Sequence, residues 1–222
     1  MTDDDESPAS DPNGKLVRTK MRWAEEGRAL TGAAADPARQ RLPPGQRLVG
    51  RLPRLDLGMV PQIDTASWRL SVGGSVETPV TWDWNTFMAQ PQVDTVSDIH
   101  CVTTWSRYDT AWQGVTARHL LSVVRPTATA RAVMLRSHDG YSTNVPLDEF
   151  AADGVLLAHR LDGAPLPPDH GGPVRVVVPR LYFWKSAKWL RHIEVMDEDR
   201  PGYWEQRGYH MHGDPWTEER YD

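Results

Sequence analysis

The sequence predicts an α+β fold with a β-rich core, because short strand-like segments outnumber helical ones and turn residues recur along the chain. The clearest buried strand is 174–178, a run of β-branched residues around one arginine that Pro179 ends. The best helix candidate is a single segment, 116–124. No internal repeat is present, so one mixed domain is favoured over a repeat architecture.

Four further segments are expected to be strands. Residues 68–72 alternate apolar and polar side chains and then meet Gly73 and Gly74, which indicates a strand followed by a turn. The other three segments are apolar or alternating runs at 132–135, 155–158 and 192–195.

Two segments are expected to be helical. In residues 116–124, Thr116 can cap the N-terminus, the leucines and Val124 share one apolar stripe, and Pro126 follows the C-terminus. Residues 82–88 are interpreted as a short helix.

The chain is expected to have four parts. Residues 1–14, rich in Asp, Ser, Pro and Gly, predict a disordered terminus. Residues 15–62 form an extended arm, 63–196 the folded domain, and 197–222 a C-terminal arm packed on it. The arm either lies over the domain or brings an arginine to an anionic ligand. The candidate arginines are Arg39, Arg41, Arg47, Arg51 and Arg54.

Composition excludes several classes of protein. A net charge of -5 argues against a nucleic-acid-binding surface, which usually shows a basic excess. A single cysteine rules out an intrachain disulfide, a Cys-ligated iron–sulfur cluster and a multi-Cys zinc site within the chain.

Targeting signals are also not evident. The N-terminus is acidic and lacks an apolar stretch, no Arg-Arg pair occurs, and no apolar run approaches the ~20 residues of a membrane span. We therefore expect a soluble, cytoplasmic protein without a membrane span.

Cys101 is the first candidate for chemistry. A lone cysteine is commonly an inert buried residue. Here His100 and the hydroxyl residues Thr103, Thr104 and Ser106 surround it, which favours a place at a site. A thiolate is the soft ligand that a sulfur-bound, high-valent metal prefers.

Tyr141 follows Gly140 in a turn after the expected strand 132–135. The glycine allows a sharp turn that lifts the phenol out of the sheet. A phenol there can donate a hydrogen bond to an oxo group or an anion. An ordinary loop is the alternative.

Basic residues also occur where apolar ones dominate. Arg175 interrupts the buried strand, and a buried arginine needs an anion, either a structural carboxylate or a phosphate. Lys185 and Lys188 lie among aromatic residues, which fits a flat heterocycle that carries phosphate.

Together these segments resemble a known family. Cys-Val-x-x-Trp-Ser at 101–106, Gly-Tyr-x-x-x-x-Pro at 140–146, Leu-Pro-x-Asp-His-Gly-x-Pro-Val-Arg-Val-Val-Val-Pro at 166–179 and Lys-Ser-Ala-Lys-Trp-Leu at 185–190 are similar to the catalytic domain of the sulfite oxidase and nitrate reductase superfamily. The form of the cysteine motif resembles that of the bacterial methionine-sulfoxide-reductase catalytic subunit more than that of animal sulfite oxidase. The tail from Gly202 to Trp216 resembles that of short bacterial members.

The resemblance implies a sulfite-oxidase-type fold of β-rich mixed sheets with short helices around one molybdopterin. It implies Cys101 as the molybdenum ligand and Tyr141 as the active-site phenol. The pterin or its phosphate would be held by His170, Arg175, Ser186 and Lys188. The enzyme would pass electrons singly to or from an external partner.

The sequence departs from sulfite oxidases directly after the cysteine. Those enzymes carry an arginine cluster there, whereas residues 102–106 are uncharged and Arg107 is displaced. Reduction of a small or protein-borne S-oxide or N-oxide is therefore expected, with sulfite oxidation by an external acceptor as the alternative.

Two other functional classes are alternatives. A cysteine hydrolase needs an imidazole near Cys101, and His100 points to the opposite face of an extended strand. A non-catalytic pterin-binding module would need neither Cys101 nor Tyr141. His210 and His212 provide only two imidazoles for a metal, so an ordered C-terminal arm is favoured there.

Overall fold

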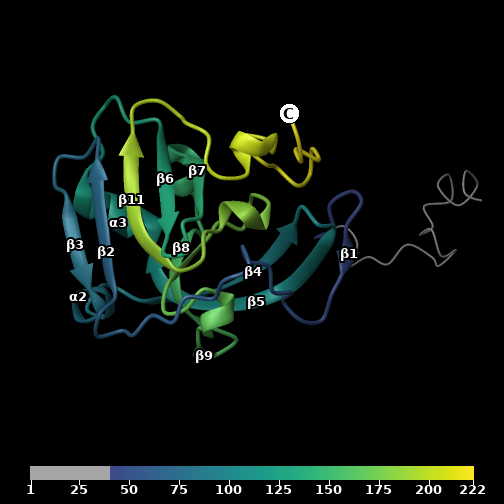
Figure 1. Ribbon diagram of the computed structural model, residues 1–222, viewed down its shortest axis with the longest axis horizontal. Coiled ribbons are helices and arrows are strands. Elements are labelled where there is room, and N and C mark those ends of the chain that lie inside the picture. Colours follow the sequence, from purple (N-terminus) through teal and green to yellow (C-terminus); the bar gives the residue numbers. More distant parts are fainter. Residues whose placement is uncertain (1–40) are drawn as a thin grey trace, which may run out of the picture. The chain divides into compact units, whose positions relative to one another are not determined.

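Two β-sheets and a few short helices make up residues 41–222, the part of the chain that this computed structural model describes (Figure 1). The predictions made for residues 1–14, and for the arm as far as Arg39, lie outside the described residues. Residues Leu42–Asp222 form one compact unit.

The first sheet has six strands and is mostly antiparallel. Its central order is β1-β5-β8-β10, with β4 paired to β5 and β9 paired to β8. Only the short β1 runs parallel to its neighbour. The strands are β1 (Arg47–Leu48), β4 (Val93–Cys101), β5 (Trp105–Thr116), β8 (Leu156–Leu161), β9 (Ala164–Pro165) and β10 (Arg175–Val177).

The second sheet has five strands in the order β3-β2-β11-β6-β7. β2 and β11 are parallel and the other pairs are antiparallel, so the sheet is mixed. In Figure 1 β2, β11 and β6 stand side by side. The strands are β2 (Arg69–Gly74), β3 (Val80–Asp83), β6 (Ala132–Ser137), β7 (Ser142–Pro146) and β11 (Leu190–Met196).

The helices are short, and the one predicted from its cap is confirmed. Thr116 accepts a hydrogen bond from the His119 backbone at 3.1 Å and begins α3 (Ala117–Val124). Arg125 ends it in the left-handed conformation, one residue before Pro126. The remaining helices are α2 (Trp84–Met88), α4 (Leu147–Phe150) and the 3-10 turns η2 (Pro168–His170), η3 (Phe183–Lys185) and η4 (Glu205–Arg207).

Two predicted boundaries are wrong. The helix expected at 82–88 begins only at Trp84, because Trp82 pairs with Leu70 in the sheet and Asp83 caps the helix. The turn expected at Gly73 and Gly74 comes later, because both glycines continue β2 against β11. A side chain at Gly74 would meet the Val195 carbonyl at 2.1 Å, so the strands approach too closely there for any other residue.

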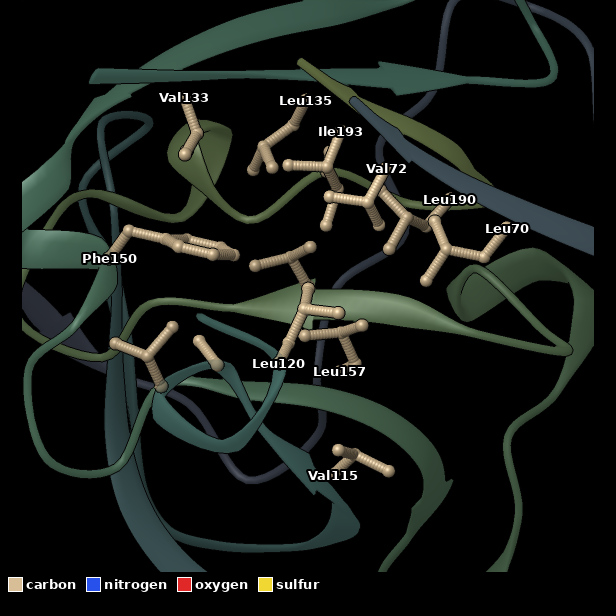
Figure 2. Packing of buried hydrophobic residues seen from close by; sticks show 14 of the residues in the cluster. Leu70, Val72, Val115, Leu120, Val133, Leu135, Phe150, Leu157, Leu190 and Ile193 are labelled. Carbon is tan, nitrogen blue, oxygen red and sulfur yellow. The ribbon is translucent and has the colours of Figure 1, made fainter. Parts of the chain in front are cut away.

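The main core lies between the two sheets. Figure 2 shows side chains of both sheets meeting around Leu120 of α3, with Val115 and Leu157 from the first sheet and Val72 and Ile193 from the second. The first sheet is also covered on its other face. Leu156 and Val177, whose neighbours Leu157 and Val176 face the main core, belong to a second apolar cluster. This alternation is the period of two that a β-strand imposes.

The C-terminal residues fold back on the second sheet. The Tyr203 backbone donates a hydrogen bond to the Ser142 carbonyl, and the Tyr182 backbone donates one to the Gly213 carbonyl, each at 2.8 Å. In Figure 1 this yellow segment lies beside β7. Within residues 41–222, no helix has the length and apolar character needed to cross a membrane.

Candidate functional site

A cavity of about 320 Å³ lies where the end of β4, the β6–β7 turn and the segment after β9 converge. Its volume falls within the range of small-molecule and cofactor pockets. All six residues that the sequence nominates line this one cavity: Cys101, Tyr141, His170, Arg175, Ser186 and Lys188.

Cys101 is the last residue of β4 and begins a tight connection to β5. The Thr104 backbone donates to the Cys101 carbonyl at 3.0 Å, and Thr104 takes a positive φ of 71°. The thiol is only 4% exposed, and its sulfur lies 3.2 Å from Thr103 Oγ1. Burial raises the pKa of Cys101, while the Thr103 hydrogen bond and the charge of Arg220 lower it. A bound metal cation would displace the proton.

His100, the neighbour of Cys101, is turned to a different partner. Its Nδ1 lies 2.8 Å from Ser106 Oγ, and it does not line the cavity. The alternation of side chains along β4 explains the separation. This geometry gives no support to a hydrolase in which His100 activates Cys101.

Arg175 opens β10 with its side chain fully inside the protein, 2% exposed. Its guanidinium donates to the carbonyls of His170 at 2.9 Å and Ser186 at 2.8 Å. Among the described residues no carboxylate forms an ion pair with it. Burial lowers the pKa of Arg175 to about 9, so the group stays charged at neutral pH. The structural carboxylate that would explain this buried charge is therefore not found in residues 41–222.

His170 and Lys188 are brought together by a glycine turn. Gly171 takes a φ of 106°, and a side chain there would meet Lys188 Cβ at 2.8 Å. Lys188 Nζ donates to the Asp169 carbonyl at 3.2 Å, and burial lowers the pKa of Lys188 to about 8. Ser186 Oγ accepts a hydrogen bond from the Val178 backbone at 2.9 Å, which leaves its own proton for another acceptor.

Tyr141 follows Gly140, whose φ of 88° makes the turn that the sequence predicts. The Tyr141 hydroxyl donates to the Trp184 carbonyl at 2.6 Å. Burial, followed by the nearby charge of Glu205, raises the pKa of Tyr141 well above 10. The phenol keeps its proton at physiological pH, and that proton is directed at the protein backbone.

One of the candidate arginines of the arm reaches the cavity: Arg54 lines it and forms an ion pair of 2.7 Å with Asp169. The cavity also contains aromatic residues that sequence reasoning missed. Trp204 and Tyr209 enter it from the C-terminal residues, and Trp105 and Phe183 complete an aromatic lining. The ten tryptophans of the sequence were the one signal for such a lining.

Two cations near the motifs do not reach the cavity. Lys185, which the sequence placed beside a heterocycle, is fully buried in an ion pair of 2.7 Å with Glu205. Arg107 forms an ion pair of 2.6 Å with Asp162. Neither lines the cavity, so the interpretation of Lys185 as a ligand-binding residue is wrong.

The two tail histidines share one carboxylate. His210 Nδ1 lies 3.3 Å and His212 Nδ1 2.8 Å from Glu219 Oε2. In the described part of the chain, no three His, Cys, Asp or Glu side chains are grouped as a metal site would require.

The lining fits a flat, anionic cofactor with a soft metal. Arg54, Arg175 and Lys188 supply positive charge, the aromatic rings supply flat apolar surfaces, and Cys101 supplies the thiol. Three lining residues also carry buried polar atoms without a hydrogen-bond partner in the described structure, which is costly. These atoms are Trp105 Nε1, Ser137 Oγ and Asp169 Oδ1.

Residues 57–204 match the family model of the oxidoreductase molybdopterin binding domain. The chain belongs to this family. The matched range thus contains every residue of the cavity wall except 53–56 and Tyr209. Membership confirms the sulfite-oxidase-like superfamily, the oxidoreductase class and the molybdopterin cofactor that the motifs predicted.

Relatives of this molybdopterin domain differ greatly in length. The chain is 46% identical over 182 residues to the uncharacterized oxidoreductase YuiH of Bacillus subtilis, which covers 82% of this chain and 92% of that protein. It is 33% identical over 153 residues to the protein-methionine-sulfoxide reductase catalytic subunit MsrP of Ralstonia nicotianae, covering 62% of this chain and 46% of the relative. Mitochondrial sulfite oxidase of Macaca fascicularis is 44% identical over 72 residues, 31% of this chain and 13% of that enzyme.

The fold is also similar to that of a solved structure. The sulfane dehydrogenase SoxCD of Paracoccus pantotrophus superimposes with a TM-score of 0.58 at 20% identity. The match covers 63% of this chain and 40% of the SoxCD chain. The predicted fold class, β-rich mixed sheets with short helices, is confirmed.

Proposed function

We propose that this molybdopterin enzyme reduces an S-oxide or N-oxide, small or protein-borne, with electrons from an external partner. The observation that carries the proposal is that the lining residues directly after Cys101, namely Val102, Thr103 and Trp105, are uncharged. When bound, the cofactor supplies the two-electron redox chemistry of oxygen-atom transfer, and the protein supplies binding, orientation and exclusion of water.

Cys101 is proposed as the protein ligand of molybdenum. It is the sole cysteine of the chain, and its thiol lines the cavity. The tight connection through Thr104 fixes the backbone on one side of the sulfur. Thiolate sulfur is the ligand type that a sulfur-coordinated metal prefers.

Arg175, Lys188, His170 and Ser186 are proposed to hold the pterin and its phosphate. The first two bring positive charge that no described carboxylate neutralises through an ion pair. Ser186 has a proton to donate, and the backbone of His170 fixes the guanidinium of Arg175. Charge-assisted hydrogen bonds of this kind are short and strong on phosphate oxygens.

The side of the cavity near Cys101 favours a neutral substrate over sulfite. Recognition of a small dianion calls for fixed positive charge close to the metal. Val102, Thr103 and Trp105 line that part of the cavity, and Arg107 is held by Asp162. The similarity to a methionine-sulfoxide reductase subunit points to the same substrate class.

Reduction of an oxide consumes protons, and Tyr141 is proposed to orient the substrate oxygen. Its hydroxyl stays protonated because burial raises its pKa. The hydrogen bond to the Trp184 carbonyl holds the phenol on the cavity wall, and the proton would turn from that carbonyl to the substrate oxygen when the substrate binds.

Metal analysis and steady-state kinetics test the proposal on one preparation. Protein from a host that makes the cofactor should contain about one molybdenum per chain. S-oxides and N-oxides should be reduced with a dye donor more efficiently than sulfite is oxidised with a dye acceptor. Zinc, or no metal, in such material would contradict the metal assignment.

Sulfite oxidation is the second candidate, and Arg54 is the observation in its favour. Its side chain is 59% exposed and lines the cavity, so it has room to turn toward an anion. If sulfite is oxidised far more efficiently than any oxide is reduced, this alternative replaces the first. An Arg54→Ala variant should then raise the KM for sulfite.

A further inference from the structure

The C-terminal segment, residues 202–213, is part of the cavity wall. Trp204 and Tyr209 line the cavity and pack against the apolar cluster that contains Cys101. The ring of Tyr209 lies 5.2 Å from that of Trp184 and 5.1 Å from that of Trp204, measured between ring centres. Most of the segment, residues 205–213, lies beyond residue 204, where the family match ends.

One buried lysine joins this segment to the domain. Lys185 is 0% exposed, and its ammonium donates to Glu205 Oε1 at 2.7 Å and to the Met211 carbonyl at 2.6 Å. It also donates to Asn144 Oδ1 of β7 at 2.8 Å. Two of these acceptors belong to the C-terminal segment and one to the sheet, so the charge bridges the two.

The carboxylate of Glu205 extends this bridge to the cavity wall. Its Oε1 also accepts from Trp184 Nε1 at 2.9 Å and from Thr143 Oγ1 at 2.8 Å. Trp184 in turn accepts the Tyr141 hydroxyl through its carbonyl. The ion pair therefore links the segment to two residues that line the cavity.

The segment is closely fitted at both ends. A side chain at Gly202 would meet Thr143 Cα at 2.5 Å, and one at Gly213 would meet the Trp184 ring at 2.8 Å. The segment is therefore closely packed on the domain at both ends and joined to it by a buried ion pair in between. If one member of the ion pair is lost, we expect the whole segment to detach from the domain together.

We propose that Lys185 is the positioning residue that holds the C-terminal segment closed over Cys101. Its ammonium does not bind the cofactor. It fixes the segment that carries Trp204 and Tyr209, and so restricts access to the thiol and the release of the cofactor. The proposal concerns the closure of the cavity and does not depend on which substrate the enzyme uses.

The sole cysteine provides a direct test. In full-length protein purified without cofactor, the rate at which a thiol reagent labels Cys101 measures access to the cavity. Trypsin cleavage after Arg207, which lies within the segment, measures release of the segment itself. In the loaded protein, the rate of pterin release is the third measurement.

Lys185→Met leaves the carboxylate of Glu205 buried without its cation, so local opening of the segment becomes easier. We expect the rates of Cys101 labelling, of cleavage after Arg207 and of pterin release each to increase roughly tenfold or more. Lys185→Met combined with Glu205→Gln removes both charges and keeps the amide oxygen that Trp184 and Thr143 need. This double variant should return the three rates to within about threefold of the wild type.

Leu120→Ala is the matched control for general destabilisation. Leu120 is fully buried in the main core, away from the segment. This variant should lower the melting temperature without accelerating labelling or cleavage after Arg207. If Lys185→Met behaves like Leu120→Ala, or labels at the wild-type rate, the positioning role is overturned.

A second variant keeps the proposal testable if Lys185→Met does not fold. If Lys185→Met yields no folded protein, Glu205→Gln carries the same measurement, because it weakens the ion pair and keeps every acceptor. Wild-type rates in Glu205→Gln would then overturn the proposal. An enzyme without molybdenum would refute the proposed function but would leave the labelling result intact.

Discussion

The guanidinium carbon of Arg175 lies 4.2 Å from the centre of the Phe183 ring, so a buried cation and an aromatic face meet beside the cavity. Cation–π contact and hydrogen bonds to backbone carbonyls hold the charge without a carboxylate. A phosphate bound in the cavity would complete this arrangement, which leads to the first prediction.

Arg175→Met should destabilise the protein and weaken cofactor binding together. Hydrogen bonds from a charged donor contribute about 1.5–3 kcal/mol each, and the cost of burying the charge offsets part of this. We expect the free energy of unfolding without cofactor to fall by about 2–4 kcal/mol. Thermal melts with and without cofactor, together with pterin content, measure both effects.

Arg118→Met is the control for the loss of an arginine. Arg118 pairs with Asp153 on the surface, where both side chains are exposed. Its replacement should change stability by less than about 0.5 kcal/mol. If Arg175→Met shows the melting temperature and pterin content of this control, the buried charge stabilises neither the fold nor the cofactor.

Cys101→Ser should abolish turnover but leave much of the pterin bound. Cys101 is proposed to act on the metal, whereas Arg175, Lys188 and His170 act on the pterin and phosphate. Activity and extractable pterin are measured on the same sample. Full activity in the serine variant would remove Cys101 from the mechanism, and complete loss of pterin would show that the thiolate carries the binding.

Some elements of this structure could be predicted because interactions between residues close in sequence determine them. The β-branched run around Arg175 favours a buried strand, and the Thr116 side chain caps the helix that begins one residue later. Six cavity residues could be predicted because they lie within short sequence motifs of the family: Cys101, Tyr141, His170, Arg175, Ser186 and Lys188.

Other side chains could not be placed from the sequence, because their contacts are with residues far away along the chain. Lys185 and Lys188 look alike in sequence, yet the 3-10 turn that ends at Lys185 sends that side chain toward Glu205, twenty positions further along the chain. Tyr209 reaches the cavity from the C-terminal segment, and Arg54 is the arginine of the arm that lines it. The sequence offered several arm arginines and could not decide among them, because such contacts arise from tertiary packing.

Lys188 should make cofactor binding depend on pH. Burial, followed by the charge of Arg175, lowers the pKa of Lys188 to about 8. The protonated ammonium attracts phosphate, and the neutral amine does not. The affinity of the cofactor-free protein for pterin should therefore fall as the pH rises from about 7 to about 9. Lys188→Met should bind weakly with little pH dependence, while Lys188→Arg should keep the wild-type affinity to higher pH.

The stability of the cofactor-free protein should change in the opposite direction. An unfolded lysine titrates near about 10.4, so between about 8 and about 10 the unfolded state binds more protons than the folded state. This group therefore makes stability rise with pH in that window. Melting curves of the wild type and Lys188→Met isolate its contribution. Identical pH profiles for the two proteins would show that Lys188 is not perturbed.

Tyr141→Phe should slow the reaction while leaving the cofactor bound. Removal of the hydroxyl leaves the Trp184 carbonyl without its 2.6 Å hydrogen bond, at a cost of about 1 kcal/mol in stability. If the phenol orients the substrate oxygen and assists protonation, kcat should fall by about a hundredfold. Because burial raises the pKa of Tyr141 well above 10, the wild type should show no loss of activity from this group up to about pH 9. Tyr203→Phe is the control, since its ring lies 6.0 Å from that of Tyr141 but does not line the cavity. Equal kcat values for the two variants, at equal pterin content, would show that Tyr141 only supports the wall.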